Sequence, residues 1–255
     1  MSFDDSEHPD FPPLADETVL WRYLDLPKFL AVMEDQALHF TRADLMADRW
    51  EGSAGPVNLE AGPTLYGEDY ARMRPQMAYA RQRMRQEIYL NCWHASAHES
   101  AAMWSLYQSS GQGIAIQTTW GALKSSLGSP WPIHGGAVSY VDYRVTFIPE
   151  GNLFSPFMHK RVSFAHEREV RLVLWSHADR GPLGTVTLGD ENAAAASGPT
   201  PPGYDVPVDL TQITDQVYVA PEAAGWYAEL VGKVIKRYEL PWTVQHSDLS
   251  ADPIW

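Results

Sequence analysis

The stretch VLWRYLDLPKFLAVMEDQALHFTR, residues 19–42, decides the fold class because it switches twice between a strand pattern and a helix pattern. Residues 19–24 are apolar and aromatic, which favours a short strand. Asp25 is suited to cap a following helix, with Pro27 in its first turn and residues 29–33 supplying an apolar face. Alternation over residues 37–42 predicts a second strand.

The rest of the chain continues this irregular order. We expect a loop over residues 43–63, which carry Gly, Pro, Asp and Asn, and an interruption at Pro75 of the helix-prone segment that follows. No regular strand–helix–strand unit repeats, which favours an α+β domain with a mixed, largely antiparallel central sheet flanked by helices. Further strands are expected at 88–94, 114–118, 137–143, 170–175, 184–188 and 216–220, and further helices at 70–90, 99–107 and 222–238.

The chain has 255 residues, which fits one domain. Residues 1–17 are acidic and contain proline, so we expect a flexible N-terminal segment before a single domain over 18–255. A loop insertion is expected near 178–207, with an alanine run and Pro-Pro-Gly. The start does not resemble a signal peptide, and no stretch approaches the roughly 18 apolar residues of a membrane span. Cys92 is the single cysteine, which excludes an intramolecular disulfide, and a cytoplasmic protein is expected.

The net charge of −13 argues against broad electrostatic binding of duplex DNA. A local basic cluster remains in residues 72–85, which contain five arginines. Neither GxGxxG nor a Walker loop is present, and the Gly-x-Gly at 111–113 follows an expected helix instead of a strand. This order excludes a Rossmann dinucleotide site.

Two segments predict anion or metal chemistry. Arg22 lies between Trp21 and Tyr23, so its stacked guanidinium is suited to a phosphate or carboxylate; the alternative is a surface arginine beside two core rings. Asp44, Asp48 and Glu51 gather at a strand-to-loop junction, where they are suited to a divalent ion. The alternative there is a capped turn with solvated acids.

Residues 92–104 contain His94, His98 and Glu99, but no HExxH pattern, and no GxSxG elbow surrounds Ser96 or Ser100. Neither a zinc site nor a serine hydrolase is therefore expected there.

A pair of carboxylates marks residues 160–171. Glu167 and Glu169 would share one face of an extended chain, where like charges disfavour joint ionisation unless cations compensate. Lys160, Arg168 and Arg171 are near enough in the sequence to do so. The pattern suits a catalytic carboxylate, and the alternative is a solvated salt-bridge network.

Together these segments resemble the bacterial family called domain of unknown function 2971, over most of residues 20–240. The resemblance rests on the opening Trp-Arg-Tyr strand, the Trp-Glu-Gly turn at 50–52, the Trp-His strand with its Met-Trp-x-x-Tyr helix in 92–107, and the Glu-x-Glu-x-Arg segment at 167–171. Membership in this family implies no established activity.

The order of Arg, Ser and Glu-x-Glu also resembles the layout of Arg-Ser-Glu ADP-ribosyltransferases, although the usual Ser-Thr-Ser triplet is absent. The resemblance implies NAD as substrate, with Arg22 on a phosphate or ribose and Ser96 bracing the nicotinamide ribose. Glu169 would stabilise the oxocarbenium-like transition state through the ribose 2′-OH, and Glu167 would orient or deprotonate the acceptor. The remaining residues implied at the cofactor are Tyr23, Trp93, Trp104, Tyr107 and Arg171.

The leading hypothesis is an NAD-consuming transferase or glycohydrolase without a metal, acting on a nucleotide, nucleic-acid or protein acceptor in a toxin or phage-defence role. A second hypothesis is a metal-dependent nuclease or phosphoesterase built from Asp44, Asp48, Glu51 and the Glu167/Glu169 pair. A third is a non-catalytic sensor module with an aromatic groove. The acceptor and the oligomeric state stay open.

Overall fold

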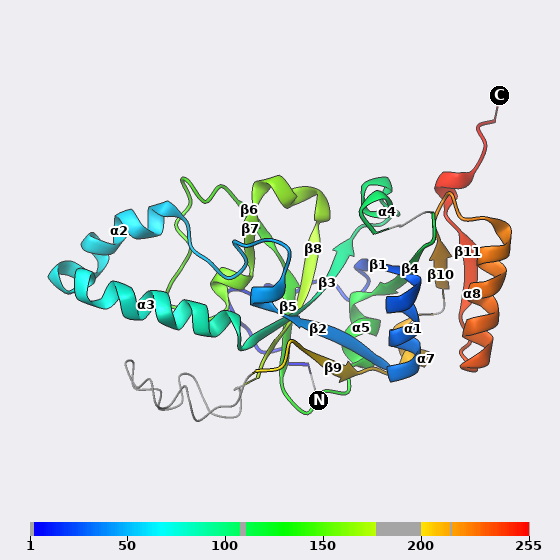
Figure 1. The fold of residues 1–255 in the computed structure, drawn as a ribbon, viewed down its shortest axis with the longest axis horizontal. Helices are drawn as coiled ribbons and strands as arrows, with labels where there is room; N and C mark the ends of the chain where they lie inside the picture. The colour runs from blue at the N-terminus through cyan, green and yellow to red at the C-terminus, as the bar shows by residue number, and fades with distance from the viewer. Residues whose placement is uncertain (1–2, 108–110, 177–199, 215, 255) are drawn as a thin grey trace.

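The computed structural model describes residues 3–107, 111–176, 200–214 and 216–254, and nine strands within them form one mixed sheet (Figure 1). β10 and β11 pair in parallel, and the other pairings of this sheet are antiparallel. The single-domain α+β fold predicted from the sequence is therefore confirmed. The strands are β1 (Val19–Asp25), β2 (Ala37–Arg42), β3 (Ile88–Ala95), β4 (Gly113–Thr119), β5 (Ile133–Ala137), β8 (Glu169–Trp175), β9 (Gly203–Pro207), β10 (Gln216–Val219) and β11 (Thr243–His246).

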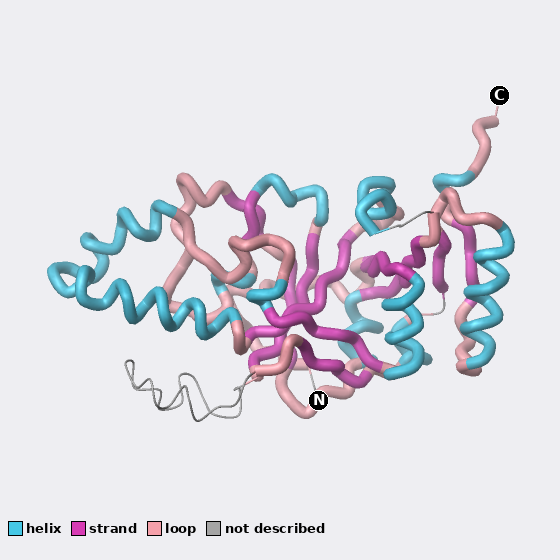
Figure 2. The backbone as a smooth tube through the Cα atoms, viewed as in Figure 1, coloured by secondary structure: helices cyan, strands magenta, loops and turns pink. Residues whose placement is uncertain are grey.

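Helices flank this sheet, and two of them extend away from it (Figure 2). In the described residues the α-helices are α1 (Leu26–Asp35), α2 (Pro56–Tyr66), α3 (Tyr70–Arg85), α4 (Ala101–Tyr107), α5 (Trp120–Ser126), α7 (Leu210–Ile213) and α8 (Gly225–Arg237). Short 3-10 helices that matter for the site are η1 (Ala43–Leu45), η3 (Ser155–Phe157) and η4 (Val162–Glu167). Two short strands, β6 (Ser139–Val141) and β7 (His159–Arg161), pair in parallel beside the main sheet.

The first strand and helix form as the sequence predicts. The Asp25 side chain accepts a hydrogen bond from the Lys28 amide and so caps α1, while Pro27 occupies its first turn. α1 buries Phe29, Val32 and Met33 in the main core. The main core also receives side chains from α5, α7 and α8 on the same sheet.

The sheet splits along one edge of β3. On this edge β1 pairs with the end of β3, at Trp21↔His94, and β2 pairs with its beginning, at Thr41↔Leu90. The other edge of β3 is continuously paired with β8. The three residues 91–93 therefore face a gap between the diverging strands β1 and β2. This gap places the site described below.

The segment expected as a loop over residues 43–63 is largely helical, which corrects that prediction. Pro56 occupies the first turn of α2, where a missing amide hydrogen costs nothing. Gly62 faces the ring of Tyr70, and a Cβ there would lie 2.1 Å from that ring. The glycine therefore permits close packing of α2 on α3 instead of marking a turn. α3 also runs through Pro75 without ending, and the two helices project from the body (Figure 1).

The N-terminal segment packs against the sheet, unlike the flexible segment expected for residues 1–17. Phe3 forms a bridge with Ile133, and its ring meets Trp120 edge-on at 5.3 Å. Phe11 is buried in a second apolar cluster. These two phenylalanines hold the segment against the sheet, although its acidic and proline-containing sequence suggests mobility. Phe11 is buried and Phe3 partly buried, and removing their apolar surface from water favours the packed state.

The insertion expected near 178–207 ends in a strand. Residues 203–207 form β9 and pair with β2 from Ala37↔Pro207 to Thr41↔Gly203, because β2 offers an edge on that side. Residues 177–199, including the strand expected at 184–188, lie outside the described residues. The strand expected at 137–143 is replaced by the end of β5 and by β6, and the last helix begins at Gly225. Among the described residues, no helix is both long and apolar enough to cross a membrane.

Candidate functional site

A cavity of about 560 Å³ opens where β1 and β2 diverge from β3. Side chains replace the strand hydrogen bonds that are missing at this gap. Arg22 donates from Nη1 to the Cys92 carbonyl at 3.0 Å and to Asn91 Oδ1 at 2.8 Å. Asn91 Nδ2 in turn donates to the His39 carbonyl of β2 at 2.9 Å. Two backbone carbonyls at the split are thus satisfied by side chains, and space for a ligand remains.

Arg22 brings a positive charge to the cavity. Its guanidinium lies 5.6 Å from the Trp93 ring centroid, and it forms no ion pair with any described carboxylate. Its buried Nε has no hydrogen-bond partner among the described residues. Burial lowers the pKa of Arg22 below its ordinary value, because the charged form is costly to desolvate. An anionic ligand group would relieve this cost.

Aromatic side chains line the face opposite to Arg22 on β1, since successive strand residues alternate. Tyr23 and Tyr107 both line the cavity, and their rings are stacked at a centroid distance of 6.5 Å. Tyr107 is 45% exposed and is therefore accessible to a planar ligand. Partial burial raises the pKa of the Tyr107 phenol; the charges of Glu167 and Glu169 raise it further, whereas Arg22 lowers it. The cation, both carboxylates and this phenol thus line one cavity.

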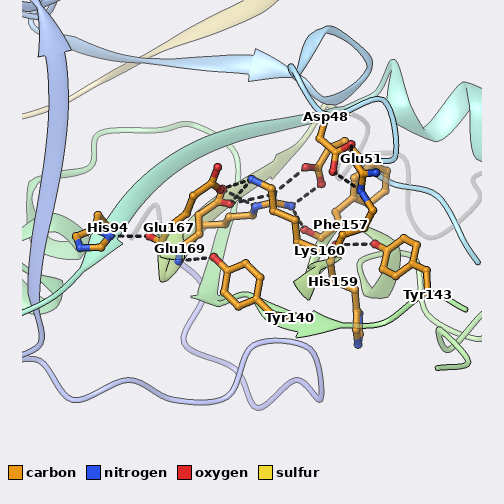
Figure 3. Close-up of polar contacts among 12 residues, drawn as sticks. Asp48, Glu51, His94, Tyr140, Tyr143, Phe157, His159, Lys160, Glu167 and Glu169 are labelled. Carbon is orange, nitrogen blue, oxygen red and sulfur yellow. Dashed lines mark hydrogen bonds and ion pairs between the residues drawn. The ribbon is translucent and has the colours of Figure 1, made fainter. Parts of the chain in front are cut away.

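An ionic network also lines the cavity, through Glu51, Lys160, Glu167 and Glu169 (Figure 3). Lys160 Nζ bonds to Glu167 Oε2, and to Glu169 Oε2 at 3.0 Å. Arg171 holds the other side of Glu169, with Nε 2.7 Å from Oε1. Glu51 closes the network by a two-point contact with Arg171, at 2.5 and 2.8 Å. Three carboxylates thus share two cations in a largely buried cluster.

The two glutamates meet at Lys160 by a route that differs from the extended chain expected over residues 167–169. Glu167 is the last residue of η4, and Glu169 is the first of β8. Arg168 between them adopts a left-handed conformation, with φ of 40°. This turn directs both carboxylates to the ammonium of Lys160, and Arg171 also contacts Glu169. Lys160 and Arg171 thus compensate the carboxylates as expected. Arg168 itself is exposed and makes no ion pair among the described residues.

A tight turn presents Glu51 to Arg171. Asp48 Oδ1 accepts from the Trp50 amide at 3.0 Å, and the Glu51 amide donates to the Asp48 carbonyl at 3.0 Å. Gly52 has φ of +68°, and a Cβ there would lie 2.3 Å from the Phe157 ring. Glycine is therefore required at this position for both its backbone angle and its lack of a side chain.

The network shifts the pKa values of two of its carboxylates in opposite directions. Burial alone would raise the pKa of Glu169, but attraction to Arg171 and Lys160 outweighs it and lowers the pKa to about 2. Burial raises the pKa of Glu51, although Arg171 opposes this shift. Attraction to Glu169 raises the pKa of Lys160 despite its burial. Glu169 is therefore a permanently ionised group at neutral pH.

His94 also faces the cavity. Its Nδ1 lies 2.6 Å from the Glu167 carbonyl, which only accepts, so Nδ1 carries the hydrogen and Nε2 is an acceptor. Burial lowers the pKa of His94, which keeps the imidazole neutral. The Trp-His motif of β3 provided the sequence signal for this residue, but its spacing predicted no role.

The structure brings together most of the residues predicted from the sequence. Those that line the cavity are Arg22, Tyr23, Trp93, Tyr107, Glu167 and Glu169. Trp104 does not: it is 1% exposed, and its indole donates to Glu99 Oε2 at 2.7 Å, so it is part of the core below Tyr23. Arg171 is fully buried behind Glu169 and positions that carboxylate instead of contacting a ligand. The predicted ligand contacts of Trp104 and Arg171 are therefore corrected: the first is a core residue and the second positions Glu169.

Ser96 follows the end of β3 and does not line the cavity. Its amide donates to the Val19 carbonyl, its own carbonyl accepts from the Trp21 indole at 2.9 Å, and its hydroxyl accepts from the His98 amide at 3.3 Å. These bonds join β1 to β3 at the rim of the gap. The structure gives Ser96 a place beside the site, without direct access to it.

The carboxylates of the metal hypothesis all have cationic partners. Asp44 pairs with Arg42 at 2.6 Å, and Asp48 pairs with Arg161 at 2.6 Å. Glu51, Glu167 and Glu169 belong to the ionic network described above. Within the described residues, no group of three or more His, Cys, Asp or Glu side chains is arranged to hold a metal ion. The geometry therefore supports salt bridges at these positions.

Comparisons with known proteins add no relative: the chain matches no protein-family model, and no curated protein matches it.

Proposed function

We propose that the cavity binds NAD and that the protein cleaves its bond between nicotinamide and ribose. One observation carries the proposal: a half-buried guanidinium without a carboxylate partner among the described residues, and two carboxylates paired with Lys160, line the same cavity of about 560 Å³. A volume of this size is within the range of small-molecule and cofactor sites. The resemblance to Arg-Ser-Glu ADP-ribosyltransferases supports the same assignment.

Arg22 supplies the anchor for a phosphate. Its Nη1 donates to Asn91 and Cys92, which fixes the guanidinium, and the group has no ionic partner among the described residues. The Trp93 ring lies beside the guanidinium, with its centroid 5.6 Å from Cζ. Arginine in such a fixed orientation binds phosphate oxygens with a defined geometry. Tyr107, accessible at the cavity, provides a surface for the nicotinamide ring.

Glu167 and Glu169 supply negative charge where the ribose becomes positive. Cleavage breaks the bond between C1′ and the nicotinamide nitrogen, and the bonding electron pair leaves with the nicotinamide. The resulting oxocarbenium-like centre is stabilised by fixed carboxylates. Both oxygens of Glu169 are held by Arg171 and Lys160, whereas Oε1 of Glu167 has no partner among the described residues. Glu167 is therefore the carboxylate that contacts the ribose or the acceptor, and Glu169 acts beside it as a fixed charge.

An acceptor then adds to C1′ as its proton passes to Glu167 or to neutral His94. If water is the acceptor, the products are nicotinamide, ADP-ribose and one proton. If a hydroxyl, amine or ring nitrogen is the acceptor, the product is its ADP-ribose conjugate. Both outcomes use the same carboxylates and balance without a metal or an oxidant.

The first experiment is calorimetric titration of NAD into the wild-type protein, R22Q and R144Q. Arg144 is exposed and does not line the cavity, so R144Q removes the same charge from a solvated position. We expect saturable binding by the wild type and by R144Q, and an affinity loss of about tenfold or more in R22Q, because charged hydrogen bonds contribute roughly 1.5–3 kcal/mol. Equal binding by R22Q would overturn the role of Arg22, and absence of binding by the wild type would overturn the function.

Turnover is tested by measuring free nicotinamide with E167Q and E169Q. We expect E167Q to bind NAD normally and to release nicotinamide at least about a hundredfold more slowly. Normal turnover by E167Q contradicts the assignment of the contacting carboxylate.

A further inference from the structure

A second, open hollow of about 390 Å³ lies beside the cavity and is lined by residues 47–50, Arg161 and Phe164. We call it the outer hollow. Asp48 and Phe164 line both spaces, so the two adjoin. Phe164 is the link: its ring centroid lies 4.9 Å from Lys160 Nζ, which bonds to Glu167. A group bound in the outer hollow would therefore lie next to the carboxylates of the cavity.

The outer hollow offers a stacking surface with a fixed cation. The guanidinium of Arg161 lies 5.3 Å from the Phe164 centroid and 5.8 Å from the Trp50 centroid. Asp48 holds it in this place, with Nη2 2.6 Å from Oδ1. Trp50 is 39% exposed although a large indole is costly to leave in water. Two rings and one oriented guanidinium are the features that stack nucleobases.

The charge of the outer hollow is opposite to that of the whole chain. Arg49 is exposed at its wall, and Arg85 donates from Nη2 to the Arg49 carbonyl at 3.3 Å. Arg49 and Arg161 thus line the outer hollow with one carboxylate, Asp48, and Arg85 adjoins it, in a protein of net charge −13. An anionic planar group is favoured here, whereas a cationic acceptor such as an arginine side chain would be repelled.

We propose that the outer hollow binds a base of single-stranded nucleic acid and so presents it as the acceptor of ADP-ribose. The base stacks on Trp50 beside Arg161, and Arg49 meets a neighbouring phosphate. A duplex does not fit this role because its bases are already stacked on one another. The assignment of an acceptor rests on the proposed NAD chemistry, but the binding of a single strand does not.

The test is fluorescence anisotropy of a labelled oligo-dT of ~12 nucleotides with the full chain and without NAD. W50A is compared with W226A, which removes a more exposed indole (59% against 39%) from α8, a helix at one end of the molecule that does not line the outer hollow (Figure 1). We expect W50A to weaken binding at least about fivefold and W226A to leave it unchanged, since W50A removes the ring on which a base stacks. Equal binding by W50A and wild type overturns the proposal.

A second pair of variants guards against misfolding of the Trp50 turn. R49Q is expected to weaken binding and to reduce the slope of log affinity against log salt by about 0.7, the value for one phosphate contact on a single strand, whereas R144Q leaves both unchanged. Unchanged affinity and slope in R49Q overturn the phosphate contact. A duplex of the same sequence and an acidic peptide of similar charge are the competitors. Displacement of the oligonucleotide by the peptide at equal concentration overturns recognition of bases.

The two proposals fail separately. If the oligonucleotide binds and W50A weakens it but NAD is neither bound nor cleaved, the outer hollow stands and the NAD function is wrong. If NAD is cleaved but the wild type binds no oligonucleotide, the function stands and the outer hollow has another role. With both intact, mass spectrometry of the oligonucleotide after incubation with NAD must show the added mass of ADP-ribose, and its absence overturns the acceptor assignment.

Discussion

The guanidinium of Arg171 donates to both carboxylate oxygens of Glu51, from Nη1 to Oε1 at 2.5 Å and from Nη2 to Oε2 at 2.8 Å, although 120 positions separate the two residues in the chain. Both side chains are almost completely inaccessible to solvent. The contact joins the turn after η1 to strand β8. Arg171 also donates to Glu169 and so fixes the position of that carboxylate. A buried ion pair of this kind fixes geometry more than it adds stability, since desolvation offsets much of the attraction. The position of Glu169 in the cavity therefore depends on the buried contact between Glu51 and Arg171.

Substitution of Glu51 by Gln tests this organisation. E51Q keeps the shape but leaves Arg171 with one carboxylate partner, and we expect a loss of about 3–5 kcal/mol in the free energy of unfolding. Urea denaturation measures it. D142N is the matched control, because Asp142 pairs with Arg144 at the surface and its loss is expected to be undetectable. A change in E51Q as small as in D142N would show that the pair does not support the fold.

Gly52 is expected to be intolerant of a side chain. G52A must adopt a left-handed backbone and bring its Cβ against the Phe157 ring, so it should lose at least about 1–2 kcal/mol from the backbone alone. G151A is the control, because a Cβ on Gly151 meets nothing within 4 Å. Thermal melts of both variants check the prediction. Equal melting temperatures would contradict the role of the turn.

Much of the fold was predictable from local sequence patterns. The elements that depend on packing against distant segments were not. The Asp25 cap and the strand at residues 19–24 follow from neighbouring residues alone, so their prediction is confirmed. α2 was missed because Pro56 and Gly62 have packing roles that only the partner surfaces reveal. β9 was missed because it forms on an edge supplied by β2, far away in the sequence.

The same distinction holds for the site. The Glu-x-Glu-x-Arg pattern correctly indicated compensated carboxylates, since Lys160 and Arg171 both bind Glu169. It could not show that Arg171 lies below the carboxylate, nor that Glu51 arrives from another segment. Trp104 likewise has the spacing of a helix face, and spacing does not distinguish a core ring from a ligand contact.

The pKa of Glu169 predicts an acid-labile contribution to stability. Its folded-state pKa of about 2 lies below the ordinary value of 4.5, so the ionised form favours folding. The contribution is fully present above pH ~4.5 and is lost as the pH falls toward about 2. The difference in unfolding free energy between wild type and E169Q should therefore shrink over this range. A difference that stays constant from pH 5 to pH 2 would contradict the ionised state of Glu169.

Tyr107 and Trp104, three residues apart on α4, should separate binding from stability. Tyr107 is accessible and lines the cavity, so Y107A is expected to weaken NAD binding by about fivefold or more while the melting temperature changes little. Trp104 is a core residue whose indole bonds to Glu99, so W104F should lower the melting temperature and leave the affinity for NAD nearly unchanged. Calorimetry and thermal melts on the same preparations measure both quantities. If W104F loses affinity and Y107A does not, the planar ligand stacks deeper than the cavity wall allows, and the aromatic assignment of the site is wrong.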